Sequence, residues 1–430
     1  MLGAFAQAFR TPDLRRKLLF TIFIMAAFRM GSFIPAPGVD SVAVQKCLAA
    51  QTEASLLDLV NLFSGGALLQ LSIFALGIMP YITASIIIQL LRVVVPRFDD
   101  LHKEGQTGQA TLTQYTRYLT IGLGLIQSAT TISLARSGRL FSTCSESVIG
   151  DNTVWGFLVM LITMTAGTGV IMWLGELITE RGIGNGMSLL IFTSISASMP
   201  SQLLAIGQAG KWGAVGVIVL LILLVTIVVV YLEQAQRRIP VQYAKRMIGR
   251  RQYGGTTTYI PLKINMSGVI PVIFATSILA LPPMFAQFGD QTAKWVQWIG
   301  ANFTSGAWPY LTAYAVLVVF FTFFYTAITF NPEEVADNMK RYGGFVPGYR
   351  AGRPTAEFLR YVVNRLTTAG ALYLVVIALL PALLIIPLKL SQGQMPFGGT
   401  TLLIVVGVGL QTVKEINTQL QQHHYEGFLR

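Results

Sequence analysis

Long apolar runs recur along the chain, and they constrain its fold more than any other feature. A helix needs about 20 apolar residues to cross a bilayer, and run length together with hydrophobic pattern predicts ten such segments. The composition agrees, because 53% of the residues are hydrophobic and only 12% are charged. We therefore predict an all-α integral membrane protein with ten transmembrane helices. The predicted spans are residues 18–34, 71–91, 115–135, 154–174, 186–204, 213–232, 267–288, 309–330, 366–387 and 398–416.

The positions of the basic residues predict how these spans are oriented. A net charge of +12 is compatible with nucleic-acid binding, but an excess of Lys and Arg is also typical of the cytoplasmic loops of membrane proteins. With the N-terminus in the cytoplasm, 24 of the 31 Lys and Arg residues fall on the cytoplasmic side and six outside, while Arg29 lies within the first span. Both termini are therefore predicted to be cytoplasmic. The basic stretch Arg15–Lys17 leads into the first span without a small-residue cleavage site, so we expect that span to remain as an anchor.

The outer segment 35–70 contains a short apolar stretch, Leu56–Phe63, that breaks at Ser64-Gly65-Gly66 just before the second span. This stretch is too short to cross a bilayer. Broken backbone at membrane depth is tolerated only where protein buries it or where it lines a cavity, because lipid cannot satisfy its polar groups. The pairing of a half-span with a full span therefore indicates a pore or a cavity.

Two cytoplasmic connections are also too long to be turns. Segment 233–266 has two arms with apolar residues at alternate positions around a basic centre, which predicts a projecting β-hairpin. Segment 331–365 opens on Asn331 and Pro332, a helix cap followed by a first-turn proline, and continues into a loop rich in Gly and Pro. We interpret both segments as ordered protrusions rather than linkers.

The residue types that carry most enzyme chemistry are missing from the predicted spans. The 19 acidic residues fall in loops or at span ends, whereas ion-coupled carriers usually keep ionisable groups at the midplane. His102, His423 and His424 are all predicted to be cytoplasmic, which excludes an HExxH zinc site and an intramembrane Ser-His dyad. The sequence also has no GxxxxGK nucleotide loop. We therefore expect no catalytic residue, no metal and no cofactor, and the energy for any work must come from a partner.

Two smaller features have ordinary explanations. The glycine-rich stretch Arg181–Gly186 resembles a phosphate-binding loop, but it follows a span rather than a strand, which favours a tight turn into the fifth span. Cys47 and Cys144 lack CxxC spacing, so we expect two free cysteines. A bridge between them stays open, because both lie in loops on the predicted outer side.

Several long motifs, in a consistent order, match one known family. The sequence resembles the SecY family, the channel-forming subunits of the bacterial protein translocase, over essentially its whole length. The matching stretches are residues 29–38 (RMGSFIPAPG), 61–67 (NLFSGGA), 74–82 (FALGIMPYI), 175–186 (GELITERGIGNG), 265–271 (NMSGVIP), 344–348 (GFVPG) and 398–404 (GGTTLLI).

This resemblance implies a clamshell of two five-helix halves around an hourglass pore. Five spans precede the outer turn 207–213 and five follow it, which permits an inverted-topology pair without proving that the halves are related. The implied division is an N-terminal half over 1–206, a hinge turn over 207–213 and a C-terminal half over 214–430. A plug helix over about 57–67 would fill the outer funnel at rest, and the segment between the first span and this plug is short.

The resemblance also assigns residues to three parts of the channel. A hydrophobic ring at the pore waist would exclude water and ions by dewetting without gripping a passing chain. Polar side chains on the second, third and seventh spans would form weak contacts across a lateral gate that releases hydrophobic segments into lipid. The ring residues are Ile78, Ile82, Ile191, Ile273 and Ile404; the plug residues are Leu59, Asn61, Phe63, Ser64, Gly65 and Gly66; the gate residues are Thr83, Ser85, Gln89, Gln127, Ser267, Thr276 and Ser277.

Partners follow from the same resemblance. The basic cytoplasmic loops would dock the ribosome through rRNA phosphate or the SecA ATPase through an acidic surface. SecE and SecG are the expected small membrane subunits. The expected cargo is secretory and membrane-protein polypeptides, and the expected location is the bacterial cytoplasmic membrane. The residues expected to bind cytoplasmic partners are Lys245, Arg246, Arg250, Arg251 and Arg350.

The predicted function is thus a passive protein-conducting channel that is not an enzyme. The main alternative is a solute transporter with an interrupted helix, built on inverted repeats. The missing midplane charges and the long basic loops argue against that transporter. An intramembrane enzyme is a further alternative, and no catalytic constellation supports it.

Overall fold

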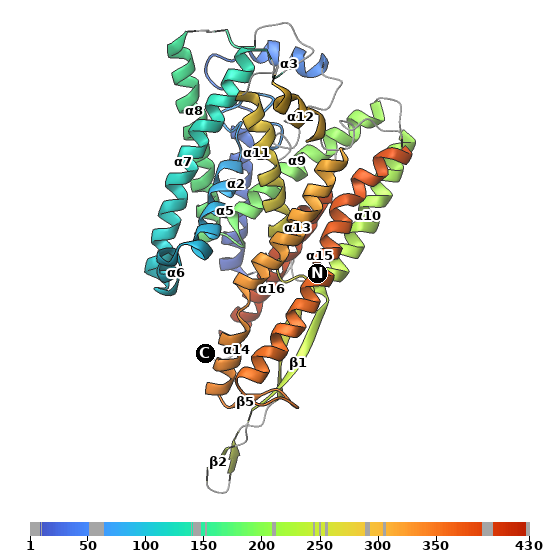
Figure 1. Cartoon of the computed structure of the whole chain (residues 1–430). Coiled ribbons are helices and arrows are strands. Elements are labelled where there is room, and N and C mark those ends of the chain that lie inside the picture. The colour runs from blue at the N-terminus through green and yellow to red at the C-terminus, as the bar shows by residue number, and fades with distance from the viewer. Residues whose placement is uncertain are drawn as a thin grey trace.

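The computed structural model describes residues 9, 11–50, 64–138, 140, 148–150, 153–208, 212–243, 246–248, 251–253, 257–288, 293–303, 307–388 and 399–426. Long helices dominate these ranges and form an elongated bundle (Figure 1). Each of the ten predicted spans overlaps one helix. These helices are α2 (Pro12–Gly31), α5 (Met79–Val94), α7 (Gln106–Arg136), α8 (Val154–Arg181), α9 (Gly186–Gln208), α10 (Trp212–Gln234), α11 (Ile270–Phe288), α13 (Trp308–Thr329), α15 (Arg353–Leu388) and α16 (Gly399–Glu426).

Fewer helices satisfy a strict test of length and apolar composition. Within the described residues, the helices that can cross a membrane by this test are α7, α8, α10, α13 and α15. A sixth is reached if α5 and α6 (Pro96–Lys103), which meet at a bend of 100°, count as one span. The protein is therefore a multi-pass membrane protein, whose described residues contain five or six helices that pass this test, and the arrangement of ten spans stays a prediction.

The start of the second predicted span was wrong by eight residues. Residues 71–78 form turns, and the helix begins only at Met79, with Pro80 in its first turn. Leu71 and Gly77 both have positive φ, 47° and 56°, which a continuous helix cannot contain. The turns are held from outside, because the Ala36 N–H donates to the Leu71 carbonyl at 2.9 Å. Contacts with residues distant in sequence therefore override the apolar pattern here.

The long helices pack in two groups. In the first group α2 contacts α8 and α9, α5 contacts α7 and α8, and α7 to α9 contact one another in order. In the second group α11, α13, α15, α16 and α10 contact one another in that order. The groups meet where α9 contacts α10 and α16, and again where α11 contacts α5 and α7. The predicted division at 207–213 stays a prediction, and residues 209–211 lie outside the described part of the chain.

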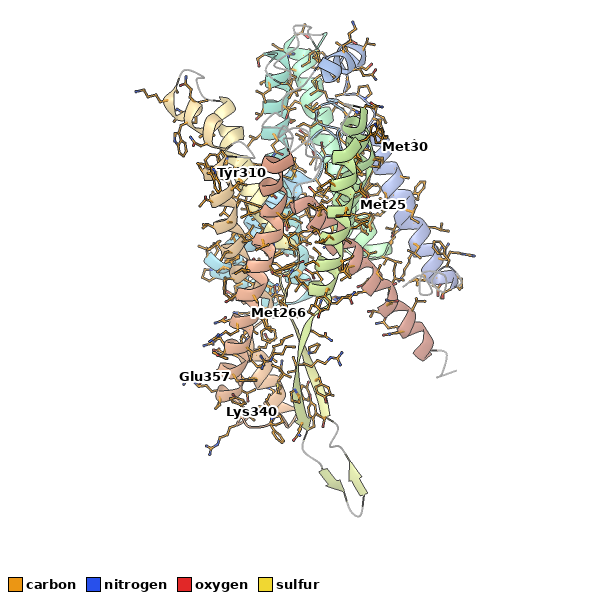
Figure 2. All side chains as sticks on the ribbon, turned by 90° about the vertical axis from the view of Figure 1, so that its right-hand side faces the viewer. Met25, Met30, Met266, Tyr310, Lys340 and Glu357 are labelled. Carbon is orange, nitrogen blue, oxygen red and sulfur yellow. The ribbon has the colours of Figure 1, made fainter. Side chains whose placement is uncertain are left out.

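The two ends of the bundle differ (Figure 1). One end carries the short helices α3 (Ser41–Ala50) and α12 (Lys294–Asn302). The other end carries the strands and α14 (Pro332–Arg341), and we call it the hairpin end. Figure 2 shows Lys340 and Glu357 at the hairpin end and Met30 and Tyr310 well away from it.

Cys47 does not fit the expectation of two free cysteines. It is fully buried in α3 and is disulfide-bonded. The sequence contains one other cysteine, Cys144, which lies outside the described residues. Two backbone contacts also hold the segment around α3. Val39 and Ile149 form an isolated antiparallel β-bridge, and the Asp40 N–H donates a hydrogen bond to the Val148 carbonyl at 3.0 Å. The segment after α2 is therefore connected to the chain between α7 and α8.

The predicted hairpin is present. Strands β1 (Gln236–Tyr243) and β4 (Thr257–Lys263) pair antiparallel, with Ile239 opposite Ile260. Strands β2 (Arg246–Ile248) and β3 (Arg251–Tyr253) extend this hairpin, and β5 (Gly344–Phe345) pairs with the other edge of β1. The predicted helix start is confirmed too, because the Asn331 side chain accepts a hydrogen bond from the Glu333 N–H at 3.1 Å at the beginning of α14.

The two predicted protrusions form one unit with a shared apolar core. Alternate residues of β1 point inward, and the loop after β5 and the first turns of α15 complete the core. The sequence of either segment alone does not reveal this shared core. It shows that one face of each strand is apolar, but not which other segment covers that face. The buried core residues are Ile239, Val241, Leu262, Met339, Val346, Leu359, Val362 and Val363.

Replacing Leu359 with alanine is expected to loosen this unit selectively. Leu359 is fully buried in the shared core, and deletion of a buried Leu side chain costs about 2–5 kcal/mol. Hydrogen exchange of the β1 and β4 amides should accelerate, while that of α7 and α8 stays unchanged. The matched control is Glu357→Ala, which removes only an exposed ion pair with Arg353, worth about 1 kcal/mol or less. Equal exchange rates in the two variants would contradict a shared core.

Candidate functional site

The five isoleucines predicted to form the pore ring are all buried. Their exposed fractions lie between 0% and 7%. All five belong to one apolar cluster, to which both helix groups contribute. They come from four helices: Ile78 directly precedes α5 and Ile82 follows one turn later, whereas Ile191, Ile273 and Ile404 lie on α9, α11 and α16. The structure thus brings the predicted residues into one cluster, which also contains many other residues, so their arrangement as a ring stays a prediction.

The seam predicted as a lateral gate corresponds to the contact of α11 with α5 and α7. Thr83 on α5 and Thr276 and Ser277 on α11 are buried, and each donates a hydrogen bond to a backbone carbonyl of its own helix at 2.8–3.2 Å. Ser267 donates to Asn265 Oδ1 at 3.0 Å, and Gln89 donates to Ser85 at 3.5 Å within α5. Gln127 lies on α7. These hydrogen bonds of Thr83, Ser85, Gln89, Ser267, Thr276 and Ser277 join residues at most four positions apart in the sequence.

Asn265 is a residue that the sequence reasoning did not assign to the site. Its side chain is buried, and its amide donates both to Glu233 Oε1 at 2.5 Å and to the Gly268 carbonyl at 3.0 Å. Glu233 lies in the last turn of α10 and Asn265 precedes α11, so this contact links the ends of two helices in the second group. The available signal in the sequence was Glu233, an acidic residue that directly follows the sixth predicted span.

The predicted plug is only partly within the described residues. Leu59, Asn61 and Phe63 lie outside them. Ser64 is buried and its hydroxyl accepts a hydrogen bond from the Leu68 N–H at 3.1 Å. Gly65 and Gly66 follow with φ of 68° and 90°, a left-handed backbone that glycine adopts without strain. The described end of this segment is therefore a turn rather than a helix.

Two arginines make contacts that the sequence reasoning did not predict. Arg29, the one basic residue within the first predicted span, donates a hydrogen bond to the Gly65 carbonyl. Arg117 on α7 binds Glu176 on α8 through two parallel bonds of 2.9 and 2.7 Å. A two-bond Arg–carboxylate contact is geometrically specific, so it fixes α7 against α8. The sequence did offer one signal for these contacts: each arginine lies within or close to an apolar helix, where a charged side chain needs a partner.

Three of the five basic residues predicted to bind partners, Arg246, Arg251 and Arg350, lie at the hairpin end. Lys245 and Arg250 fall outside the described residues, and Arg246 and Arg251 belong to β2 and β3. Arg350 is exposed, and its carbonyl accepts a hydrogen bond from the Thr355 hydroxyl at 2.7 Å. Its neighbour Tyr349 stacks on Phe358 with ring centroids 4.2 Å apart. The backbone is thus held on α15 while the Arg350 side chain faces solvent.

A cleft of about 350 Å³ opens between α14 and α15 near this arginine. Two ion pairs line it, Arg360 to Glu333 at 2.7 Å and Arg353 to Glu357 at 3.3 Å. Since these arginines are already paired, Arg350 is better placed than either of them to meet a charged partner.

Three titratable groups on α6 have shifted pKa values. The hydrogen bond from Lys103 lowers the pKa of Asp99 and raises that of Lys103, so both stay ionised near neutral pH. Burial, followed by the charge of Arg92, lowers the pKa of His102. The neutral form of His102 is therefore favoured at neutral pH, and the positive charge of this region comes from Lys and Arg.

The fold and the site together define a class of protein. It is a multi-pass membrane protein with a buried aliphatic cluster between two helix groups and a basic, ordered protrusion at one end. A family model described as SecY matches residues 72–413. The chain belongs to the SecY family. Members of this family are the channel subunits of the protein translocase and are not enzymes, so the transporter and the intramembrane enzyme are both set aside.

Full-length relatives and solved structures agree. The chain is 59% identical over 438 residues to the protein translocase subunit SecY of Streptomyces scabiei and 51% identical over 444 residues to that of Mycobacterium tuberculosis, with full coverage of both chains in each case. A solved protein-conducting channel is similar with a TM-score of 0.61 at 18% identity, covering 94% of this chain and 91% of that one. The yeast Ssh1 complex bound to the 80S ribosome gives 0.63 at 15% identity, covering 94% and 89%.

Proposed function

We propose that unfolded secretory polypeptides cross the bacterial cytoplasmic membrane between the two helix groups, through a constriction formed by Ile78, Ile82, Ile191, Ile273 and Ile404. The observation that carries this proposal is that all five side chains are buried in one apolar cluster. The residues come from α9, α11 and α16 and from the start of α5. Branched aliphatic side chains exclude water and ions from a narrow passage and offer no hydrogen bonds to a passing chain. The constriction therefore seals without holding its cargo.

The seam of α11 with α5 and α7 is the proposed lateral gate. Hydrophobic segments would leave the pore there and enter lipid. Support comes from Thr83, Thr276 and Ser277, because each hydroxyl donates to a carbonyl of its own helix and leaves that proton unavailable for a contact across the seam. Hydrogen bonds between membrane helices are also weak, so such a seam separates at low cost. The opposite contact, of α9 with α10 and α16, would act as the hinge side of the clamshell, and residues 57–67 would form the plug.

The hairpin end is the proposed cytoplasmic docking surface, which places both termini in the cytoplasm. An ATPase of the SecA type or the ribosome would bind there and supply the driving energy, while SecE and SecG would join as small membrane subunits. The exposed side chain of Arg350 on an anchored loop and the basic strands β2 and β3 support this assignment.

Crosslinking of an arrested substrate tests the path. A cysteine introduced as Ile82→Cys should form a covalent adduct with a cysteine in a secretory polypeptide that is arrested during translocation. The bond should be absent before translocation begins, because Ile82 is 7% exposed and faces other side chains at rest. The measurement is a shifted band that contains both chains.

The matched control is Ile162→Cys on α8, whose side chain is 62% exposed on the outside of the bundle. It should not crosslink to the arrested chain. Adducts at Ile162→Cys with none at Ile82→Cys, in a translocase that still exports protein, would overturn the proposed path.

A further inference from the structure

Exposed tryptophans gather at the end of the bundle opposite the hairpin end, which we call the far end. The helices α8, α10 and α13, which pass the strict test for a membrane span, all begin there (Figure 1). Each has a tryptophan at its first or second position: Trp155 on α8, Trp212 on α10 and Trp308 on α13. The exposed fractions of these side chains lie between 63% and 75%, so the bundle leaves most of each indole uncovered.

Two of these helices have a second exposed aromatic residue near their other end. Trp173 on α8 follows Trp155 by 18 residues, and Tyr231 on α10 follows Trp212 by 19 residues. At a rise of about 1.5 Å per residue, these separations are about 27 and 28 Å. The hydrocarbon core of a bilayer is about 30 Å thick, and Trp and Tyr concentrate at both of its boundaries. The two pairs therefore mark the membrane interfaces, and the tryptophans that begin α8 and α10 lie at the interface of the far end.

The short helix α12 lies at this same end and has two different faces (Figure 1). Val296 is buried and Ile299 and Phe303 are half-buried, at the spacing of one helix face. Phe303 packs against the large apolar cluster, and α12 contacts both α11 and α13. Trp295 and Trp298, which are three residues apart, are 51% and 58% exposed on another face. One face of α12 thus packs on the bundle, and the other presents two indoles to its surroundings.

Position and chemistry indicate that lipid covers these two indoles. The helices that α12 contacts are predicted spans, and α13 begins with Trp308, which resembles the tryptophans that mark the interface. An indole has an apolar ring and a polar N–H, which suits a boundary that is dry on one side and wet on the other. The one charged residue of α12 is the exposed Lys294, and a cation is compatible with a phospholipid surface.

A protein partner would need a larger surface than the two indoles offer. A fully buried tryptophan contributes about 150–250 Å², so two half-exposed ones provide roughly 200 Å², against about 800 Å² for each partner in a stable protein interface. Insertion into a lipid interface has no such minimum area, because the spans already hold the protein in the membrane.

We propose that α12 lies in the membrane interface at the far end, with Trp295 and Trp298 inserted among the phospholipid headgroups and the upper acyl chains. Because α12 is the next helix after α11 and contacts it, this lipid contact sets the depth of the far end of α11 in the bilayer. The inference is independent of the proposed polypeptide path, since it concerns only the outside of the bundle.

Fluorescence quenching by brominated lipid tests the contact. The sequence contains six tryptophans, so the variant with Trp155→Phe, Trp173→Phe, Trp212→Phe and Trp308→Phe emits only from α12. The full-length chain is reconstituted into phosphatidylcholine vesicles. Because an interfacial helix buries its apolar side chains only to a shallow depth, bromine near the headgroup end of the acyl chains should lower the emission about twofold. Bromine near the chain ends should lower it less.

Two control variants, each with all six native tryptophans replaced by phenylalanine, calibrate the depth. Leu220→Trp places an indole at an exposed position eight residues after Trp212 on α10, about 12 Å further along the helix. Bromine near the chain ends should quench this indole more strongly than bromine near the headgroups. Tyr259→Trp places an indole at an exposed position of β4 at the hairpin end, where iodide in the water should quench it and neither brominated lipid should.

A second measurement covers the case in which the variant with four substitutions does not fold. The difference in emission between the wild type and the double variant Trp295→Phe and Trp298→Phe isolates α12 while the other four tryptophans stay in place. This difference should show the same preference for bromine near the headgroups.

Three results would overturn the interfacial position of α12. Quenching by iodide without quenching by either lipid would mean that the indoles face water. Quenching by neither would mean that protein covers them, for example a second copy of the chain. Stronger quenching by bromine near the chain ends, as in Leu220→Trp, would place α12 within the hydrocarbon core.

Discussion

Replacing Ile78 and Ile273 together with asparagine is expected to make the resting channel leak ions. Both side chains are buried in the same apolar cluster, and they come from opposite sides of the seam: Ile78 directly precedes α5, and Ile273 lies on α11. An amide in each position binds water, so a constriction that was dry becomes wetted and conducts. We expect the resting conductance of purified channels in planar bilayers to rise about tenfold or more.

Buried asparagine also destabilises a helix bundle, and the control must separate that effect from the seal. The double variant Ile24→Asn and Ile377→Asn places the same two changes at buried positions of the same cluster, on α2 and α15, outside the proposed ring. It should lose a similar amount of thermal stability and remain closed. Conductance that rises equally in both double variants, or in neither, contradicts a seal at the five isoleucines.

Reversing the charge of Arg350 is expected to stop ATPase-driven export. The loop that carries Arg350 is held by the Thr355 hydrogen bond and by the stacking of Tyr349 on Phe358, so the exposed guanidinium has a defined position. We expect a docked partner to bury this guanidinium against an acidic group, and loss of one partner of a buried, hydrogen-bonded charge pair at an interface costs about 2–5 kcal/mol. Translocation of a secretory protein into inverted membrane vesicles by Arg350→Glu should therefore fall about thirtyfold or more, with normal amounts of the channel in the membrane.

Arg353→Glu is the control for this charge reversal. It lies three residues further on, and its exposed side chain already pairs with Glu357 within the chain. Export through this variant should stay within about twofold of the wild type, since exposed ion pairs contribute about 1 kcal/mol or less. Equal translocation rates in the two variants would remove Arg350 from the docking surface.

The hairpin and the helix positions could be predicted because their signals are local. Apolar residues alternate in β1 and β4, and this period places one face of each strand in a core whatever the partner is. Asn331 followed by a proline predicts a helix start from neighbouring residues alone, and the structure has its cap hydrogen bond there. The same reasoning failed at residues 71–78, where pairing with residues 34 and 36 imposes turns on an apolar run.

The residues of the candidate site also differ in whether a local signal in the sequence identifies them. The five isoleucines were assigned through family resemblance, because a single isoleucine in a membrane helix is ordinary and carries no signal of its own. Arg29 was conspicuous as a charge in a span, but its partner Gly65 lies in a different segment. No pattern within either segment connects the two residues.

By itself the sequence determined the class of the protein, the approximate positions of its helices and its basic hairpin. These properties depend on apolar content, period and capping residues within short windows. Only the tertiary structure decided that segments 236–263 and 332–363 share one core, that α11 meets α5 and α7, and that Arg29 reaches Gly65. The physical reason is that such contacts depend on how whole helices pack, and packing brings together residues between which the sequence shows no relation.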